Sequence, residues 1–86
     1  EVLLLRAVMP QLLAQRPTLV IEVLPQSHEL AALLRDIAVR GGYRIHVVPA
    51  YGSDTPVLVD PQHFDARTPQ QHRSKDVILS ITDLPA

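Results

Sequence analysis

The sequence predicts a small α/β domain, and three stretches carry this prediction. Residues 18–24 form a short run, rich in valine and isoleucine, between two prolines, which is typical of a β-strand. Residues 28–40 carry apolar side chains at helical spacing, and residues 43–48 form a second apolar run. A strand, a helix and a strand joined by short connections make a βαβ unit, whose crossover should be right-handed.

The run at residues 18–24 does not alternate between apolar and polar side chains. A strand with one face in water alternates, whereas a strand covered on both faces is apolar almost throughout. We therefore expect this strand to be covered on both faces by the flanking helices. Glu22 is the exception, because a carboxylate on a buried strand must be paired, hydrogen-bonded or placed at the strand's open end. Its candidate partners are Arg16, Arg44 and Lys75.

The amino-terminal segment predicts helices. Residues 2–8 are apolar with one exception, and a helix that is apolar on most sides is typical of the interior of a larger protein. Pro10 lacks a backbone N–H and crowds the preceding turn. We therefore expect one helix to end just before Pro10 and a short second helix to follow it, with Leu12 and Leu13 facing the sheet.

The central segment has clear helix start and stop signals. Ser27 is a good N-cap, and Glu29 in the first turn favours the helix dipole. Gly41 and Gly42 should end the helix, because glycine accepts the left-handed conformation found there. The expected apolar stripe consists of Leu30, Leu33, Leu34, Ile37 and Ala38.

Residues 50–75 read as the irregular part of the chain. A turn is expected at 52–54 and a brief extended segment at 57–59, while four prolines between 49 and 69 prevent a long helix. We expect a surface loop, and a loop of this length is usually functional or mobile. Residues 76–81 read as a last strand.

Composition excludes several function classes. The 86 residues are 47% hydrophobic with a net charge of −1, so we expect one unit over residues 1–86 that binds neither nucleic acid nor membrane. The absence of cysteine excludes disulfides and thiolate chemistry. No signal peptide or membrane-spanning run is visible, and we expect a cytoplasmic protein. Because Glu1 opens directly into an apolar run, the chain looks cut from a longer one.

Four stretches resemble the carboxy-terminal part of FkbM-type methyltransferases, which depend on S-adenosylmethionine. Residues 1–7 (Glu-Val-Leu-Leu-Leu-Arg-Ala) resemble the segment after the family's fourth strand, although Ala7 stands where glycine is usual. Residues 16–22 (Arg-Pro-Thr-Leu-Val-Ile-Glu) resemble the fifth strand, and Gly42-Tyr43 resembles the entry to the sixth. Residues 74–79 (Ser-Lys-Asp-Val-Ile-Leu) resemble the seventh strand.

The resemblance implies the carboxy-terminal portion of a doubly wound methyltransferase-like sheet. We therefore expect the last strand to be antiparallel and inserted between the other two. The resemblance also implies O-methyl transfer to a small molecule or sugar by the parent enzyme. The glycine-rich cofactor loop and the acidic residue for the cofactor's ribose belong to earlier strands of the family. We therefore expect this chain alone to be inactive and to bind no S-adenosylmethionine. The alternative is a stand-alone α/β binding or dimerisation module without catalysis.

Ligands of doubly wound sheets bind outside the carboxyl ends of the parallel strands. The candidates on that side are Glu22, Ser27, His28 and Asp76, with Glu22 either orienting substrate or forming a structural pair. Ser27 is explained by capping, and no base for a nucleophilic serine is evident. The sequence identifies no catalytic residue.

Histidines and aspartates gather in the irregular segment. Asp60, His63, Asp65 and His72 offer oxygen and nitrogen ligands, but their spacing fits no standard zinc signature, so we expect no metal site. His46 reads as a structural histidine in a strand. An apolar strand at a free sheet edge also favours pairing with another chain. We therefore expect self-association, through that edge or through the helix at residues 2–8.

Overall fold

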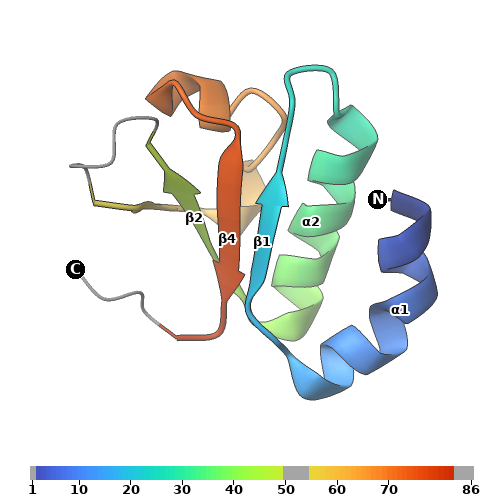
Figure 1. Cartoon of the computed structure of the whole chain (residues 1–86). Helices are drawn as coiled ribbons and strands as arrows, with labels where there is room; N and C mark the ends of the chain where they lie inside the picture. The colour runs from blue at the N-terminus through green and yellow to red at the C-terminus, as the bar shows by residue number, and fades with distance from the viewer. Residues whose placement is uncertain (1, 50–54, 83–86) are drawn as a thin grey trace.

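The computed structural model describes residues 2–49 and 55–82, and it is a small α/β domain (Figure 1). Its elements in chain order are α1 (Val2–Gln15), β1 (Leu19–Glu22), α2 (His28–Gly41), β2 (Arg44–Val48), β3 (Val57–Val59), the short 3₁₀ helices η1 (Pro61–His63) and η2 (Pro69–His72), and β4 (Asp76–Ser80). The predicted α/β class is confirmed.

The four strands form one sheet in the order β1-β4-β2-β3, and every neighbouring pair is antiparallel. Because β1 and β2 both run against β4, they share one direction. The last strand is therefore inserted between the two strands of the βαβ unit, as the sequence predicted. The row Val20, Ile78, His46 and Leu58 runs directly across all four strands.

β1 differs from its prediction in length and in burial. It covers Leu19–Glu22 rather than residues 18–24, and it lies at the edge of the sheet. Its side chains alternate between partly buried and exposed, and Val20 is 72% exposed. The expectation of cover on both faces is wrong for this chain, because α2 covers one face and Val20 points to the other.

α1 is one helix from Val2 to Gln15 that passes through Pro10, so the predicted break is wrong. Proline removes the hydrogen bond to the carbonyl of residue 6. Both Pro10 and Arg6 are exposed, so water can solvate that carbonyl. The turns after Pro10 bury Leu12 in the core, and such tertiary packing keeps a helix intact where local preference would end it.

α2 and the sheet enclose the core, and the predicted apolar stripe of α2 is buried throughout. Ile45, Val47, Val77 and Leu79 of β2 and β4 are fully buried on the α2 face. Gly42 ends α2 in the left-handed conformation, with φ +70°, as predicted. α1 packs on the outer side of α2, farthest from β2 (Figure 1).

The segment after β2 is more ordered than its prediction as a surface loop. The brief strand at 57–59 is confirmed as β3. Beyond it, Phe64 and Ala66 are buried in the core, and η1 packs against α2. Packing of Phe64 and Ala66 in the core thus holds in place a segment that its prolines and polar residues predicted to be irregular. The predicted turn at 52–54, with Tyr51 beside it, lies outside the described residues.

Candidate functional site

Three chain segments meet at the edge of the sheet where β1 and β2 end and β4 begins. The Ser74 hydroxyl donates a hydrogen bond to the Val48 carbonyl at the end of β2, and it accepts one from the Asp76 N–H at 3.0 Å. The Val23 N–H donates to the Lys75 carbonyl at 2.6 Å, which joins the end of β1 to the same segment. This is the edge at the carboxyl ends of β1 and β2, where the sequence predicted the candidate residues (Figure 1, top).

Glu22 forms an ion pair at this edge. Its Oε2 lies 3.2 Å from Lys75 Nζ, and both side chains are about half exposed. The hydrogen bond and the charge of Glu22 raise the pKa of the Lys75 ammonium. Lys75 was one of the three predicted partners, but Glu22 is not a buried carboxylate as the sequence reading required. Its side chain lies on the exposed face of β1.

Asp76 lies directly opposite Glu22 in the β1–β4 register. Residues in such a pair project from the same face of the sheet, and two like charges there repel each other. Lys75 forms its ion pair with Glu22, and the negative charge of Asp76 further raises the pKa of Lys75. The structure therefore brings together two of the four predicted site residues, and Lys75 forms an ion pair with one of them.

Ser27 and Glu22 share a hollow of about 430 Å³ between the end of β1 and the start of α2. Ser27 occupies the N-cap position, but its side chain makes no capping hydrogen bond. Only its backbone carbonyl serves the helix, accepting a bond from the Ala31 N–H at 3.0 Å. The prediction that capping explains this hydroxyl is wrong, and the hydroxyl is partly accessible from the hollow.

His28 and Asp76 line two other hollows of the same edge. Asp76 lies in a hollow of about 470 Å³, together with Leu24, Arg73 and Gln70. His28 lies in one of about 500 Å³ beside Arg67 and Gln70. Pro25 and Gln70 line both, so the two hollows are neighbours on the same edge.

The sequence reading did not name Arg67, Gln70 or Arg73 as site residues. No local spacing could have found them, because their position depends on how residues 60–75 fold back over the edge. The buried side chains of Phe64 and Ala66 direct that fold. Two buried apolar residues in an otherwise polar segment were the available signal.

The histidine and aspartate cluster does not assemble into a metal centre. The Asp60 carboxylate lies 3.0 Å from His63 Nδ1, and hydrogen bonds from the Gln62 N–H and from His63 lower the pKa of that carboxyl. The Asp65 carboxylate instead accepts bonds from the backbone of Arg67 and Thr68. Within residues 2–49 and 55–82, no three acidic or histidine side chains are grouped to hold a metal ion.

His46 and Tyr43 are buried side chains that belong to the structure of the sheet rather than to the candidate site. His46 is 6% exposed in the middle of β2. The Tyr43 hydroxyl donates a 2.7 Å hydrogen bond to the Pro17 carbonyl, and burial raises the pKa of this phenol. Tyr43 thereby ties the start of β2 to the connection between α1 and β1.

Protein-family models, curated proteins and solved structures contain no match to this chain. In the described part of the chain, neither helix has the length and apolar character needed to cross a bilayer.

Proposed function

We propose that the chain is the carboxy-terminal, acceptor-side portion of an S-adenosylmethionine-dependent methyltransferase of the FkbM type. In this proposal the parent enzyme methylates an oxygen of a small molecule or sugar. The chain supplies the strands and loops that meet the acceptor, and the cofactor is held by residues outside this sequence.

The observation that carries the proposal is the strand order. β4 is the last strand in sequence, yet it lies antiparallel between β1 and β2, which share one direction. The resemblance implies this insertion for the end of a methyltransferase sheet. A simple βαβ unit followed by a hairpin would instead add its last strand at an edge. The four stretches of the resemblance also fall on α1, β1, the start of β2 and β4 in the required order.

The outer side of the sheet supports a missing neighbour. The 2.6 Å bond from the Val23 N–H to the Lys75 carbonyl marks residues 19, 21 and 23 as those whose backbone groups face β4. The N–H and C=O groups of Val20 and Glu22 therefore point to the open edge. Leu3 and Leu4 of α1 are also exposed, Leu3 by 83%. A further strand beside β1 would form hydrogen bonds with the backbone groups of Val20 and Glu22. It would also help to cover Leu3 and Leu4.

The residues present do not fit the cofactor. The sequence has three glycines, and Gly41 and Gly42 end α2 rather than opening a phosphate- or nucleotide-binding turn after a strand. We derive no chemical step at the cofactor from this chain. Its own contribution is acceptor binding, and Glu22 and Asp76 are the carboxylates at the edge that are placed to accept a proton from an acceptor hydroxyl.

The test uses this chain and a longer protein that includes the coding sequence upstream of Glu1. Calorimetric titration with S-adenosylmethionine should give saturable binding to the longer protein and none to the 86-residue chain. The longer protein should also transfer radiolabelled methyl groups to a sugar acceptor, and Asp76→Asn should reduce that transfer while leaving cofactor affinity unchanged. Saturable binding by the short chain, or no binding by the longer one, contradicts the proposal.

The second candidate is a stand-alone binding or dimerisation module, and the exposed β1 edge favours it. A free edge whose outward positions include the apolar Val20 is a template for strand pairing. The prolines that flank β1, Pro17 and Pro25, do not protect it, because both lie outside Leu19–Glu22 and leave the N–H groups of Val20 and Glu22 in place. An upstream region without a glycine-rich turn, combined with a stable homodimer of the chain, would favour the module over the enzyme.

A further inference from the structure

The two neighbouring hollows that share Pro25 and Gln70 form a shallow trough, with Asp76 in one half and His28 in the other. Its side chains are of the kinds that bind carbohydrates. Leu24 and Pro25 give it an apolar side, which suits the C–H face of a sugar ring. Gln70 lies at its centre, and Gln71 lines its far half. The Gln70 amide nitrogen donates to the Ala66 carbonyl at 3.3 Å. That bond orients the side chain and leaves its amide oxygen to accept a hydrogen bond from a ligand hydroxyl.

The charges along the trough favour an acidic ligand. Arg67, Arg73 and Lys75 line it, against the single carboxylate of Asp76, whereas the whole chain carries a net charge of −1. Lys75 is already paired with Glu22. Among the described residues, the guanidinium groups of Arg67 and Arg73 have no hydrogen bond or ion pair.

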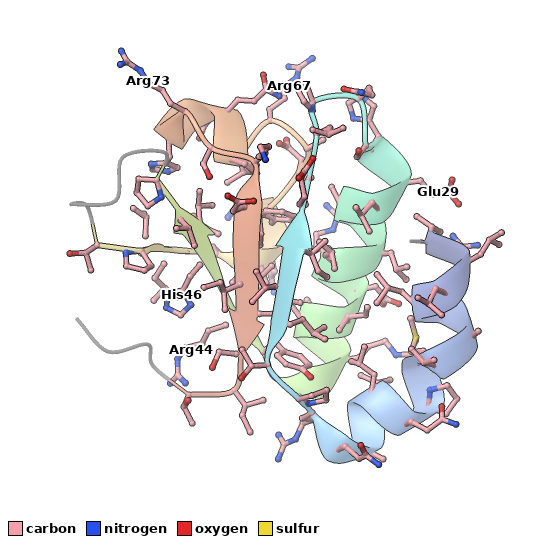
Figure 2. All side chains as sticks on the ribbon, in the orientation of Figure 1. Glu29, Arg44, His46, Arg67 and Arg73 are labelled. Carbon is pink, nitrogen blue, oxygen red and sulfur yellow. The ribbon has the colours of Figure 1, made fainter. Side chains whose placement is uncertain are left out.

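The two arginines mark different parts of the trough. Both project outward from the same edge, from separate points along it (Figure 2). Arg73 borders the half with Asp76, and Arg67 borders the half with His28. Arg73 also has a left-handed backbone, with φ +54°, an unusual conformation for a residue with a side chain. Its N–H and that of Ser74 donate to the carbonyls of Gln70 and Pro69, which fix it there.

We propose that this trough binds an acidic carbohydrate, with the ring faces against Leu24 and Pro25, the hydroxyls at Gln70 and Gln71, and carboxylates at Arg73 and Arg67. Because the two arginines line different hollows, they would hold the carboxylates of different sugar residues, and the proposed ligand is an oligomer. The assignment rests on the proposed function in one respect, because it names the acceptor class for the same edge. Binding itself requires no cofactor and is a property of this chain.

The test is titration of the ¹⁵N-labelled chain with trigalacturonate, with maltotriose as a neutral trimer and inorganic phosphate as a free anion. Trigalacturonate should shift the amide signals of Gln70, Gln71 and Lys75. Arg73→Gln and Arg67→Gln should each weaken binding by about fivefold, as expected for exposed charge pairs. Arg35→Gln, which changes an exposed arginine of α2 away from the trough, is the matched control and should bind like the unchanged chain.

Equal binding of maltotriose would overturn the acidic specificity. Equal shifts with phosphate would reduce the trough to a site for simple anions, and equal weakening by Arg35→Gln would reduce the effect to net charge; each result overturns the proposal. Urea midpoints of the variants show whether a substitution has impaired folding. If one arginine variant fails to fold, the other still tests the proposal. Methyl transfer to a neutral acceptor without trigalacturonate binding would overturn this inference alone. Binding without any methyl transfer by the longer protein would overturn the proposed function alone.

Discussion

The two faces of the sheet differ sharply in how they are covered. On the α2 face, Ile45, Val47, Val77 and Leu79 are fully buried. On the other face, the row that crosses all four strands begins with Val20 and ends with Leu58, which are 72% and 58% exposed. The chain thus builds a complete core on one side of the sheet and leaves apolar side chains of its outer strands in water on the other.

This contrast explains why the apolar run at β1 misled the sequence reading. A strand that is apolar on both faces predicts cover on both, and the prediction is correct for the face that carries Leu19, Ile21 and Val23. The other face keeps the same kind of side chain without a cover. The residue pattern therefore predicts a cover on both faces of β1, and the described residues supply it on one face only.

Truncation of one residue on each face tests the contrast most strongly. Leu79→Ala removes a fully buried side chain and should cost about 2–5 kcal/mol in the free energy of unfolding, because the core cannot refill the cavity. Val20→Ala should cost less than about 1 kcal/mol, because water already surrounds that side chain. Urea denaturation of both variants measures the difference. Equal losses would show that Val20 is covered in solution.

Tyr43→Phe tests the link between the core and the β1 side. Loss of the hydrogen bond to the Pro17 carbonyl should cost about 1 kcal/mol. Because burial raises the pKa of Tyr43 in the folded chain, its contribution is complete below the unfolded pKa of about 10 and falls as pH rises through the higher folded value. Urea midpoints between pH 8 and pH 11 should therefore fall less steeply for Tyr43→Phe. Parallel pH profiles would contradict this reading.

Lys75→Met should have the smallest effect on stability. The Lys75–Glu22 pair is half exposed, and water and salt screen such pairs. We expect a urea midpoint close to that of the unchanged chain, with no added dependence on salt. Because Glu22 raises the pKa of Lys75, the small contribution of the pair is complete below the ordinary lysine pKa and is lost as pH rises above it, so Lys75→Met should change the slope of the stability profile only at alkaline pH. A large loss at neutral pH would mean that the pair is a structural support for β1.

The sequence predicts the parts of this fold that local chemistry determines. The stripe of α2, the left-handed Gly42 and the insertion of β4 follow from spacing, glycine and the family resemblance, and the structure has all three. The helix through Pro10 could not be predicted, because its continuity depends on the packing of Leu12.

The candidate site was predicted in part. Glu22 and Asp76 were predicted at one edge of the sheet, and the structure has them there as a register pair where β1 ends and β4 begins. The side chain of Ser27 was misassigned, since an N-cap residue need not use its hydroxyl for capping. Arg67 and Arg73 were not identified as site residues, because the fold of residues 60–75 over the edge is set by long-range packing of Phe64.

Hydrogen exchange along β1 tests the central claim most directly, which is that this strand has an open outer edge. In a dilute sample, the amides of Ile21 and Val23 should be protected and those of Val20 and Glu22 should exchange rapidly. Raising the concentration should protect Val20 and Glu22 as the chain self-associates, and Val20→Lys should suppress that gain. Equal protection of all four amides in a monomeric, dilute sample would show that the edge is already closed and would contradict the account.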